Sequence, residues 1–272
     1  MYSLKPILSD MISERFSRDF ICSKINQMKI SIISDIHAAD YNQSGNLILE
    51  KFLNHKEVLE ADVVVFLGDI FDIMIGNYDE YAQEEKAFFD WIKIHHKKKT
   101  IHFHEGNHDF HLEKLFRRMK LNVCYHQSGF VIEDEELKYY LEHGDDIELD
   151  NKSYKFYKSL IRSRAVQLLA ELKWVPYQLV RAIGTRASLR SRTIDAKYRK
   201  NAESQDIKEK FRVSYLSYKM KNLYDIVVCG HGHIKDKFIS NSRIYINNGY
   251  APHSHSFIMI ENGEATFIDL DQ

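Results

Sequence analysis

Apolar runs of strand length, separated by patterns of helical spacing, are the feature that most limits the fold of this sequence. Residues 28–34 read MKISIIS, residues 62–68 read DVVVFLG, and residues 100–106 read TIHFHEG. Between these runs, apolar residues recur at helical spacing over 46–60 and 79–96. Strands that alternate with helices in this way predict an α/β chain whose parallel or mixed sheet is covered on both faces.

The strand pattern continues, is interrupted, and then returns. Short strands are expected within 121–142 and again from Asp225 onward, whereas residues 151–222 carry almost no strand pattern. Pro176 should kink or split that region, because the proline ring disrupts a continuous helix. The sequence therefore predicts one domain over 28–272, interrupted by a helical insertion at about 151–222.

The first 27 residues place apolar side chains at helical spacing and predict an amphipathic helical extension over 1–27. They lack the continuous apolar segment of a secretory signal, and the chain has no run of about 18 apolar residues. The three cysteines, Cys22, Cys124 and Cys229, are odd in number and unevenly spaced, which argues against a disulfide framework. A cytoplasmic location is the expectation.

Each apolar strand of the α/β part is followed by carboxylate, imidazole or amide side chains. In chain order these residues are Asp35, His37, Asp69, Asp72, Asn107, His108, Asp109, His143, Asp145, His231 and His233. Ligands of open α/β sheets bind beyond the carboxyl ends of the strands, so these side chains should converge at one place. A single buried histidine is usually structural. Five groups of such polar residues, each directly after an apolar strand, are better explained by a shared site.

The residue types indicate a centre with two divalent metal ions. Carboxylate oxygens, imidazole nitrogens and an amide oxygen, without a thiolate, favour Mn, Fe, Mg or Zn over Cu(I) or an iron–sulfur cluster. Seven ligands are too many for one tetrahedral ion but suit two ions that share a carboxylate. Two divalent ions carry more charge than Asp35 and Asp69 offset, so the centre should attract a phosphate and lower the pKa of a bridging water.

The motifs D-x-H, G-D-x-x-D, G-N-H-D, H-G-D and G-H-x-H occur in this order over roughly residues 29–270. In this order the chain resembles the calcineurin-like metallophosphoesterases. The resemblance implies a β-sandwich flanked by helices, with a helical lid formed by the insertion. It also implies a metal-dependent hydrolase of phosphoric ester or diphosphate bonds, with manganese favoured among the candidate metals.

The resemblance further implies a role for each side chain. One ion would be bound by Asp35, His37, Asp69 and His233, and the other by Asp69, Asn107, His143 and His231. His108 and Asp109 would be catalytic, with His108 beside the scissile phosphate, stabilising charge or protonating the leaving group. Asp109, Asp72 and Asp145 would accept hydrogen bonds that orient that histidine and the ligands.

A finer resemblance is to the UDP-2,3-diacylglucosamine diphosphatases of lipid A synthesis. It rests on LGDIFDIMIG at 67–76, GNHDF at 106–110, HGDDIELDNKSYKFYK at 143–158 and the closing strands YINNGYAPHSHSFIMIENGEATFIDL at 245–270. That family cleaves a UDP-linked glycolipid, takes up acyl chains at the lid, and sits peripherally on the cytoplasmic face of the inner membrane. This chain departs from the usual pattern at His108, where the best-known members carry arginine, and at Gly232, where G-H-T-H carries threonine.

The insertion combines basic and apolar residues. Between residues 151 and 200 the chain holds 13 Lys and Arg against two acids, a local charge of +11. Apolar residues recur among them at helical spacing, which suits acyl chains with a basic rim for an anionic headgroup or a membrane surface. The residues predicted to bind substrate there are Arg162, Arg164, Trp174, Arg181 and Arg186.

Three other interpretations stay open at this point. The substrate could be another phosphorylated lipid, nucleotide or phosphodiester. The basic block could follow the phosphates of nucleic acid in a nuclease, although its leucines and valines at helical spacing disfavour nucleic acid as the partner. A scaffold that has lost catalysis would lack ligands, and all seven ligands are present.

Overall fold

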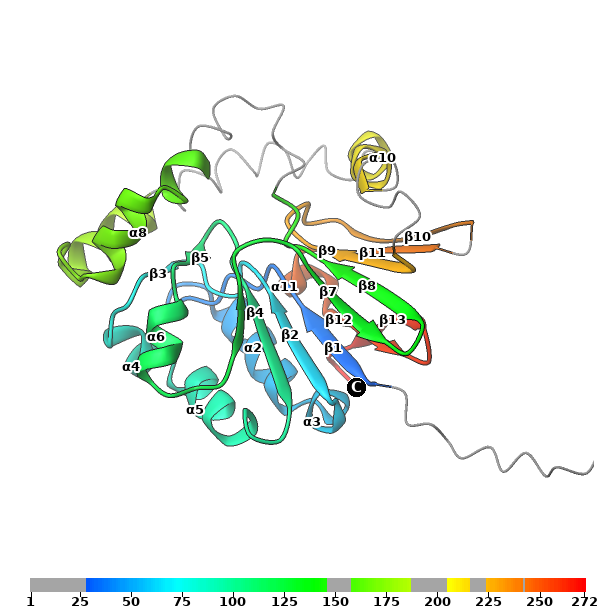
Figure 1. The fold of residues 1–272 in the computed structure, drawn as a ribbon, viewed down its shortest axis with the longest axis horizontal. Helices are drawn as coiled ribbons and strands as arrows, with labels where there is room; N and C mark the ends of the chain where they lie inside the picture. The colour runs from blue at the N-terminus through cyan, green and yellow to red at the C-terminus, as the bar shows by residue number, and fades with distance from the viewer. Residues whose placement is uncertain (1–27, 146–157, 187–204, 216–223, 242) are drawn as a thin grey trace, which may run out of the picture.

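Two β-sheets that pack face to face form the centre of the protein (Figure 1). The computed structural model describes residues 28–145, 158–186, 205–215, 224–241 and 243–272. The helix predicted over 1–27 lies outside the described residues. The predicted α/β class is confirmed by the architecture of the remainder.

The first sheet has six strands in the order β13-β12-β1-β2-β4-β6. Their bounds are β1 (Ile30–Ile33), β2 (Val63–Leu67), β4 (Thr100–His104), β6 (Cys124–His126), β12 (Ser256–Glu261) and β13 (Glu264–Asp269). Strands β1, β2, β4 and β6 are parallel, and β12 and β13 form an antiparallel hairpin beside β1. The sheet is mixed, as the sequence predicted.

The second sheet has five strands in the order β10-β11-β9-β8-β7. Their bounds are β7 (Phe130–Asp134), β8 (Leu137–Leu141), β9 (Ile226–Cys229), β10 (Lys235–Ser240) and β11 (Arg243–Asn248). A short separate pair consists of β3 (Met74–Ile75) and β5 (Asp109–Phe110). Strands from both sides of the insertion therefore build one sheet, because β8 pairs with β9.

The first sheet is buried on both faces. Ile30 and Ile32 of β1 pack toward the second sheet, and the alternate residue Ile33 packs toward helices. Phe66 of β2 contacts the ring of Phe52 on this helical side. Outside the insertion, the helices of the described residues are α2 (Gln43–Asn54), α3 (Lys56–Glu60), α4 (Glu80–Glu84), α5 (Lys86–His95), α6 (Glu113–Arg118) and α11 (Ala251–Ser254).

The described part of the insertion is helical. Helix α8 (Arg164–Glu171) ends before Pro176, and a further helix covers 177–186, so the predicted split at the proline is confirmed. Helix α10 (Gln205–Ser214) lies over the outer face of the second sheet, where it is drawn in yellow in Figure 1.

Helix α8 and helix 177–186 dock on the segment that follows β2. A Cβ at Gly76 would come within 2.9 Å of the Ala170 Cβ, and a Cβ at Gly184 would come within 2.7 Å of Ile73. Both glycines therefore allow a close approach that a larger residue would prevent. The Tyr78 hydroxyl adds a hydrogen bond to the main-chain oxygen of Val175 at 2.6 Å.

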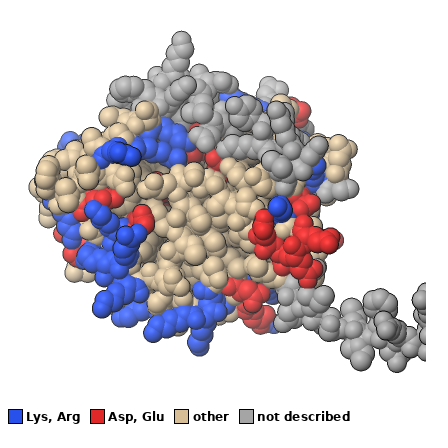
Figure 2. All heavy atoms as spheres, in the orientation of Figure 1, with Lys and Arg blue, Asp and Glu red and all other residues tan. Residues whose placement is uncertain are grey.

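Charges of opposite sign are separated on the face shown in Figure 2. Basic side chains gather along the side that carries α5 and α6, and acidic side chains gather at the β7–β8 hairpin. Among the helices that the structure describes, none is long and apolar enough to cross a bilayer.

Candidate metal centre

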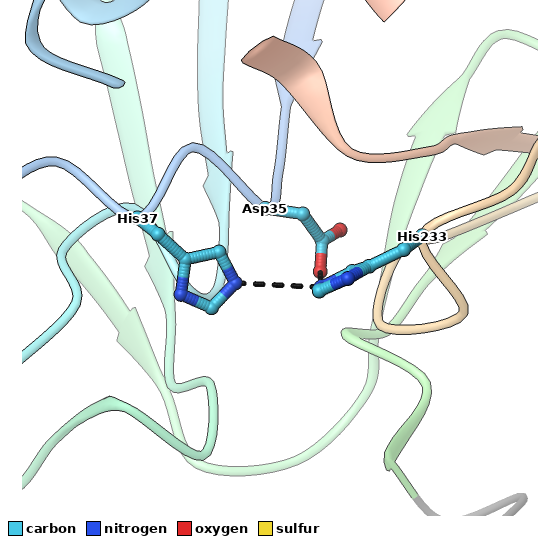
Figure 3. A group of neighbouring side chains, drawn as sticks. All are labelled: Asp35, His37 and His233. Carbon is cyan, nitrogen blue, oxygen red and sulfur yellow. Dashed lines mark hydrogen bonds and ion pairs between the residues drawn. The ribbon is translucent and has the colours of Figure 1, made fainter. Parts of the chain in front are cut away.

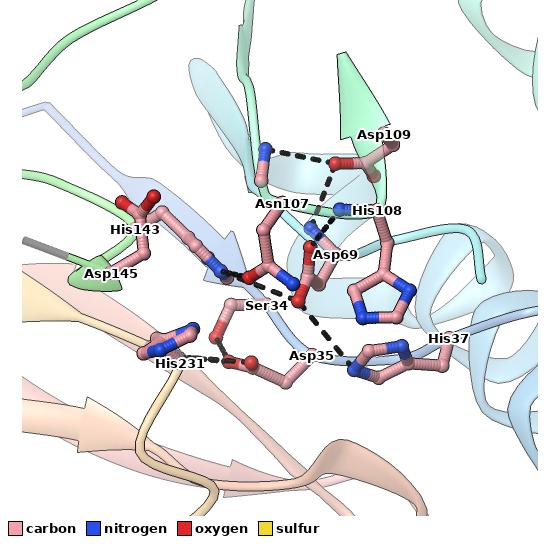
Figure 4. A network of polar contacts seen from close by, with 12 residues as sticks. Ser34, Asp35, His37, Asp69, Asn107, His108, Asp109, His143, Asp145 and His231 are labelled. Atoms are coloured by element: carbon pink, nitrogen blue, oxygen red, sulfur yellow. Dashed lines mark hydrogen bonds and ion pairs between the residues drawn. The ribbon is translucent and has the colours of Figure 1, made fainter. Parts of the chain in front are cut away.

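The predicted site residues lie together where strands of both sheets end (Figure 4). Asp35 and Asp69 follow β1 and β2 of the first sheet, whereas His143 and His231 follow β8 and β9 of the second. Asn107 comes from the loop after β4. Residues that are far apart in sequence thus meet at one place, because the parallel strands that precede them end at the same edge.

Asp35, His37 and His233 form one group of facing ligand-type atoms (Figure 3). His233 Nε2 lies 3.3 Å from Asp35 Oδ1 and 3.3 Å from His37 Nε2. The Asp35 carboxylate is fixed on its other side by the hydroxyl of Ser34, at 2.6 Å, and by the main-chain N–H of His231, at 3.0 Å. One carboxylate and two imidazoles at these separations are a donor set that divalent metals accept.

Asp69, His143 and His231 form a second group, and a third group, His37, Asp69 and His108, overlaps the other two. Asp69 Oδ2 lies 3.4 Å from His143 Nε2, and the rings of His143 and His231 are 5.2 Å apart. The amide oxygen of Asn107 is 3.4 Å from His143 Nε2. Asp69 Oδ2 is also 3.7 Å from His37 Nε2, so this carboxylate lies between the two groups.

The backbone at this site is strained. Left-handed conformations, with φ between 51° and 61°, occur at Asp35, His37, Asp69, His231 and His233. Such a conformation costs a residue with a side chain on the order of 1–3 kcal/mol and persists only where its surroundings impose it. Glycines let the chain pass close to these residues: a Cβ at Gly106 would lie 2.1 Å from Asp69 Oδ1, and one at Gly230 would lie 2.3 Å from Asp35 Oδ2.

Buried carboxylates dominate the electrostatics of the site. Burial acts to lower the pKa of His143, but Asp69 and Asp35 outweigh it and raise that pKa to about 10. Burial acts in turn to raise the pKa of Asp69, but the neighbouring histidines hold it well below its usual range. The centre therefore attracts positive charge, which metal ions would supply in place of protons. Donor types and separations fit two divalent ions that share Asp69.

The carboxylate of Asp109 holds the backbone around Asp69. Oδ1 accepts hydrogen bonds from the main-chain N–H groups of Asp69 and Gly106, each at 2.9 Å. Oδ2 accepts from Ile70 at 2.7 Å and from Phe71 at 3.2 Å. All four donors lie in the two loops that follow β2 and β4, and Asp109 is completely buried. Its carboxylate thus joins these loops.

Asp72 contacts two of the histidines. Its main-chain oxygen lies 2.8 Å from His108 Nδ1, and its Oδ1 lies 3.3 Å from His37 Nδ1. Tyr41 donates a hydrogen bond to the other carboxylate oxygen. This role for Tyr41 could not be predicted, because a hydroxyl four residues after His37 belongs to no recognisable motif. Ser34, which donates to Asp35, was missed for the same reason.

Asp145 connects the centre to the insertion. Its Oδ2 lies 2.9 Å from Lys158 Nζ and 3.4 Å from Arg162 Nη2. Arg162 also donates to the main-chain oxygen of Gln127 at 3.0 Å. Because Asp145 follows His143 by two residues, these contacts attach the start of the described insertion to a loop of the centre.

The other residues predicted to bind substrate lie on the insertion. Arg181 pairs with Glu84 and Asp40, which attaches helix 177–186 to the core. The remaining three are exposed, and within the described chain no contact joins them to the two metal-type groups: they are Arg164, Trp174 and Arg186.

Comparisons with known proteins agree with this geometry. The sequence profile of calcineurin-like phosphoesterases matches residues 28–235. The chain belongs to this family. As a calcineurin-like phosphoesterase it is a phosphoester hydrolase, and the family implies a dinuclear metal centre.

Relatives of this calcineurin-like phosphoesterase carry a more specific name. This chain is 24% identical over 208 residues to the UDP-2,3-diacylglucosamine hydrolase of Blochmanniella floridana. The match covers 76% of this chain and 80% of that relative. The enzyme of the same name from Vibrio atlanticus is 25% identical over 215 residues, covering 76% and 81%. A solved structure, the E. coli phosphoesterase YfcE, is 16% identical over 90% of this chain and 94% of that one, with a TM-score of 0.44.

Replacing Asp109 should destabilise the protein strongly. Asp109→Ala leaves four buried N–H donors without their acceptor, and each such loss costs about 1–3 kcal/mol. We expect the free energy of unfolding in urea to fall by at least about 3 kcal/mol. The matched control Asp90→Ala, at a half-exposed position on α5 that pairs with Lys86, should change it by less than about 0.5 kcal/mol. Equal stability of the two variants would contradict the structural role of Asp109.

Proposed function

We propose that this phosphoesterase hydrolyses the diphosphate of UDP-2,3-diacylglucosamine, releasing UMP and 2,3-diacylglucosamine 1-phosphate in lipid A biosynthesis. The observation that carries the proposal is the apolar surface of the insertion. Large apolar side chains there are 47–74% exposed, namely Leu168, Leu172, Trp174, Leu179 and Ile183. These five large exposed apolar side chains within residues 168–183 are more than the single ones that soluble surfaces usually show, and such concentrations often mark a ligand or membrane site. The two relatives named for this hydrolase support the same substrate.

The reaction requires the metal centre. We assign one ion to Asp35, His37, Asp69 and His233, and the other to Asp69, Asn107, His143 and His231. Oxygen and imidazole donors without thiolate suit Mn, Fe, Mg or Zn, and among these the family resemblance favours manganese. When bound, the ions supply positive charge to the phosphates and lower the pKa of a water that can attack phosphorus.

His108 is proposed as the acid at the leaving group. The main-chain oxygen of Asp72 can only accept, so the hydrogen on this 2.8 Å contact belongs to His108 Nδ1, and Nε2 is left for the substrate. Burial acts to lower the pKa of His108, but Asp69 and Asp72 outweigh it and raise that pKa, which favours the protonated ring. A protonated Nε2 can stabilise or protonate the phosphate oxygen that leaves.

Two contacts fix the apolar helices of the insertion relative to the proposed metal centre. Gly184 of helix 177–186 packs on Ile73, which directly follows Asp72. At the other end of the described helices, Lys158 pairs with Asp145. Acyl chains bound to such a fixed surface would help to position the diphosphate, so that remote binding contributes to the rate.

We further propose that the protein works at a membrane surface. The exposed Arg164 and Arg186 accompany the apolar side chains of the insertion. A basic and apolar surface of this kind binds anionic lipid headgroups at the bilayer interface. This combination supports a peripheral position at a membrane, and the family resemblance suggests the cytoplasmic face of the inner membrane.

His108→Ala should lower turnover while leaving the metals bound. Loss of a positioned acid or charge-stabilising group typically reduces the rate on the order of 10²–10⁴-fold. The measurements are kcat with Mn²⁺ and the metal content of the same sample. His255→Ala serves as the matched control, because His255 lies on the surface and pairs with Asp271. A variant at position 108 that loses metal, yet turns over normally when reloaded, would show that His108 is a ligand.

The acyl chains should determine kcat/KM. Each buried methylene contributes roughly 0.8 kcal/mol, so UDP-2,3-diacylglucosamine should exceed UDP-glucosamine by roughly 100-fold or more. Trp174→Ala should reduce kcat/KM about tenfold for the acylated substrate and leave it unchanged for UDP-glucosamine. The control Leu47→Ala removes a 49% exposed apolar side chain from α2 and should change neither value.

Two outcomes would redirect the substrate assignment. Equal kcat/KM with and without acyl chains would exclude the lipid substrate and leave a phosphoesterase of another phosphate compound. Cleavage of single-stranded DNA that weakens steeply between 50 and 200 mM salt, roughly the range over which phosphate contacts are screened, would indicate a nuclease.

A further inference from the structure

Helix α10, the last described helix of the insertion, is anchored beside the loop that carries His231 and His233. Arg212 forms two hydrogen bonds with Asp236, at 2.7 and 2.6 Å, and its guanidinium lies 4.7 Å from the centre of the Phe238 ring. Both partners belong to β10, which begins two residues after His233. The position of α10 and the position of this loop are therefore linked.

Two buried aromatic side chains, Phe211 of α10 and Tyr215 directly after that helix, rest on the two glycines that follow histidines of the centre. A Cβ at Gly232 would come within 2.7 Å of Phe211, and a Cβ at Gly144 would come within 3.0 Å of the Tyr215 hydroxyl. Phe211 and Tyr215 are four residues apart and therefore share one face of the helix. Their side chains are 6% and 1% exposed. The space that a threonine would take in the usual G-H-T-H is filled here by Phe211.

His143 and His231, the histidines that precede these two glycines, belong to the same group of ligand-type atoms. His231 precedes Gly232, His143 precedes Gly144, and both lie with Asp69 in the second group of ligand-type atoms. His143 is held on its far side by the Leu67 main-chain oxygen, 3.0 Å from its Nδ1. On the side of the insertion, α10 is the element that packs on both loops.

We propose that α10 is a positioning element for one metal ion, the ion assigned to Asp69, Asn107, His143 and His231. Phe211 and Tyr215 hold the loops of the two histidines at a separation that lets both rings face one ion. Docking of α10 and binding of that ion then stabilise each other, since such coupling is reciprocal. This inference rests on the metal centre of the proposed function.

The test measures Mn²⁺ binding to the full chain rather than activity. Wild type, stripped of metal and titrated with Mn²⁺, should bind two ions and give the electron paramagnetic resonance spectrum of a spin-coupled pair. Phe211→Ala should keep one tight ion and bind the other about 10–100-fold more weakly, the usual cost of losing support behind metal ligands. At Mn²⁺ concentrations that fill only the tight site of this variant, its spectrum should be that of a single uncoupled ion.

A second pair of variants separates positioning from general loss of structure. Gly232 has no left-handed φ, so Gly232→Ala meets an obstacle only in Phe211 and should weaken the same ion. Adding Phe211→Leu to Gly232→Ala makes room for the new methyl group and should restore much of the affinity. Ile94→Ala, at a 65% exposed position on α5 outside the insertion, should bind both ions as wild type does.

Three other results would contradict either the role of α10 or the proposed metal centre. Wild-type affinity for both ions in Phe211→Ala would overturn the role of α10 while leaving the dinuclear centre intact. Equal weakening of both ions in Phe211→Ala, with thermal melting showing a folded protein, would overturn it as well, because the effect would not be selective. Fewer than two ions in wild type would instead contradict the proposed function itself.

Discussion

The buried carboxylate of Asp109 is the interaction on which the rest of the site depends. By accepting four main-chain N–H groups it joins the turn after β2 to the loop after β4, and it places Asp69 at their junction. The Asp69 carboxylate in turn faces both groups of histidines, at 3.4 Å from His143 and 3.7 Å from His37. Any displacement of this turn would disturb both halves of the centre together.

A cluster of buried, left-handed residues is unstable by itself, so the fold has to impose it. The two sheets do so, because their parallel strands deliver the loops to one edge and their core is rigidly packed. The insertion adds a second constraint. Asp145 attaches its first described residues to the loop after His143, and Phe211 packs on the loop after His231. The insertion and the centre proposed for catalysis therefore meet at the loops that carry His143 and His231.

The sequence was sufficient to predict the strands, the helical insertion and the meeting of the ligand-type residues, because long apolar runs and the polar residues behind them are local patterns. Contacts between segments that are far apart in the sequence leave no local pattern and could not be predicted. Arg181 was predicted to bind substrate, yet its guanidinium pairs with Glu84 and Asp40, which are 97 and 141 residues away. Gly232 was visible as a departure from the usual motif, but its physical reason, the ring of Phe211, depends on how α10 packs.

The metal content of Asp69→Ala tests most directly the claim that one carboxylate serves two ions. Wild type and variant would be loaded with excess Mn²⁺, freed of unbound metal by gel filtration, and measured by mass spectrometry of the metal per chain. The account predicts two ions in wild type and loss of both in the variant, which circular dichroism should show to be folded. Retention of both ions by the variant would contradict it.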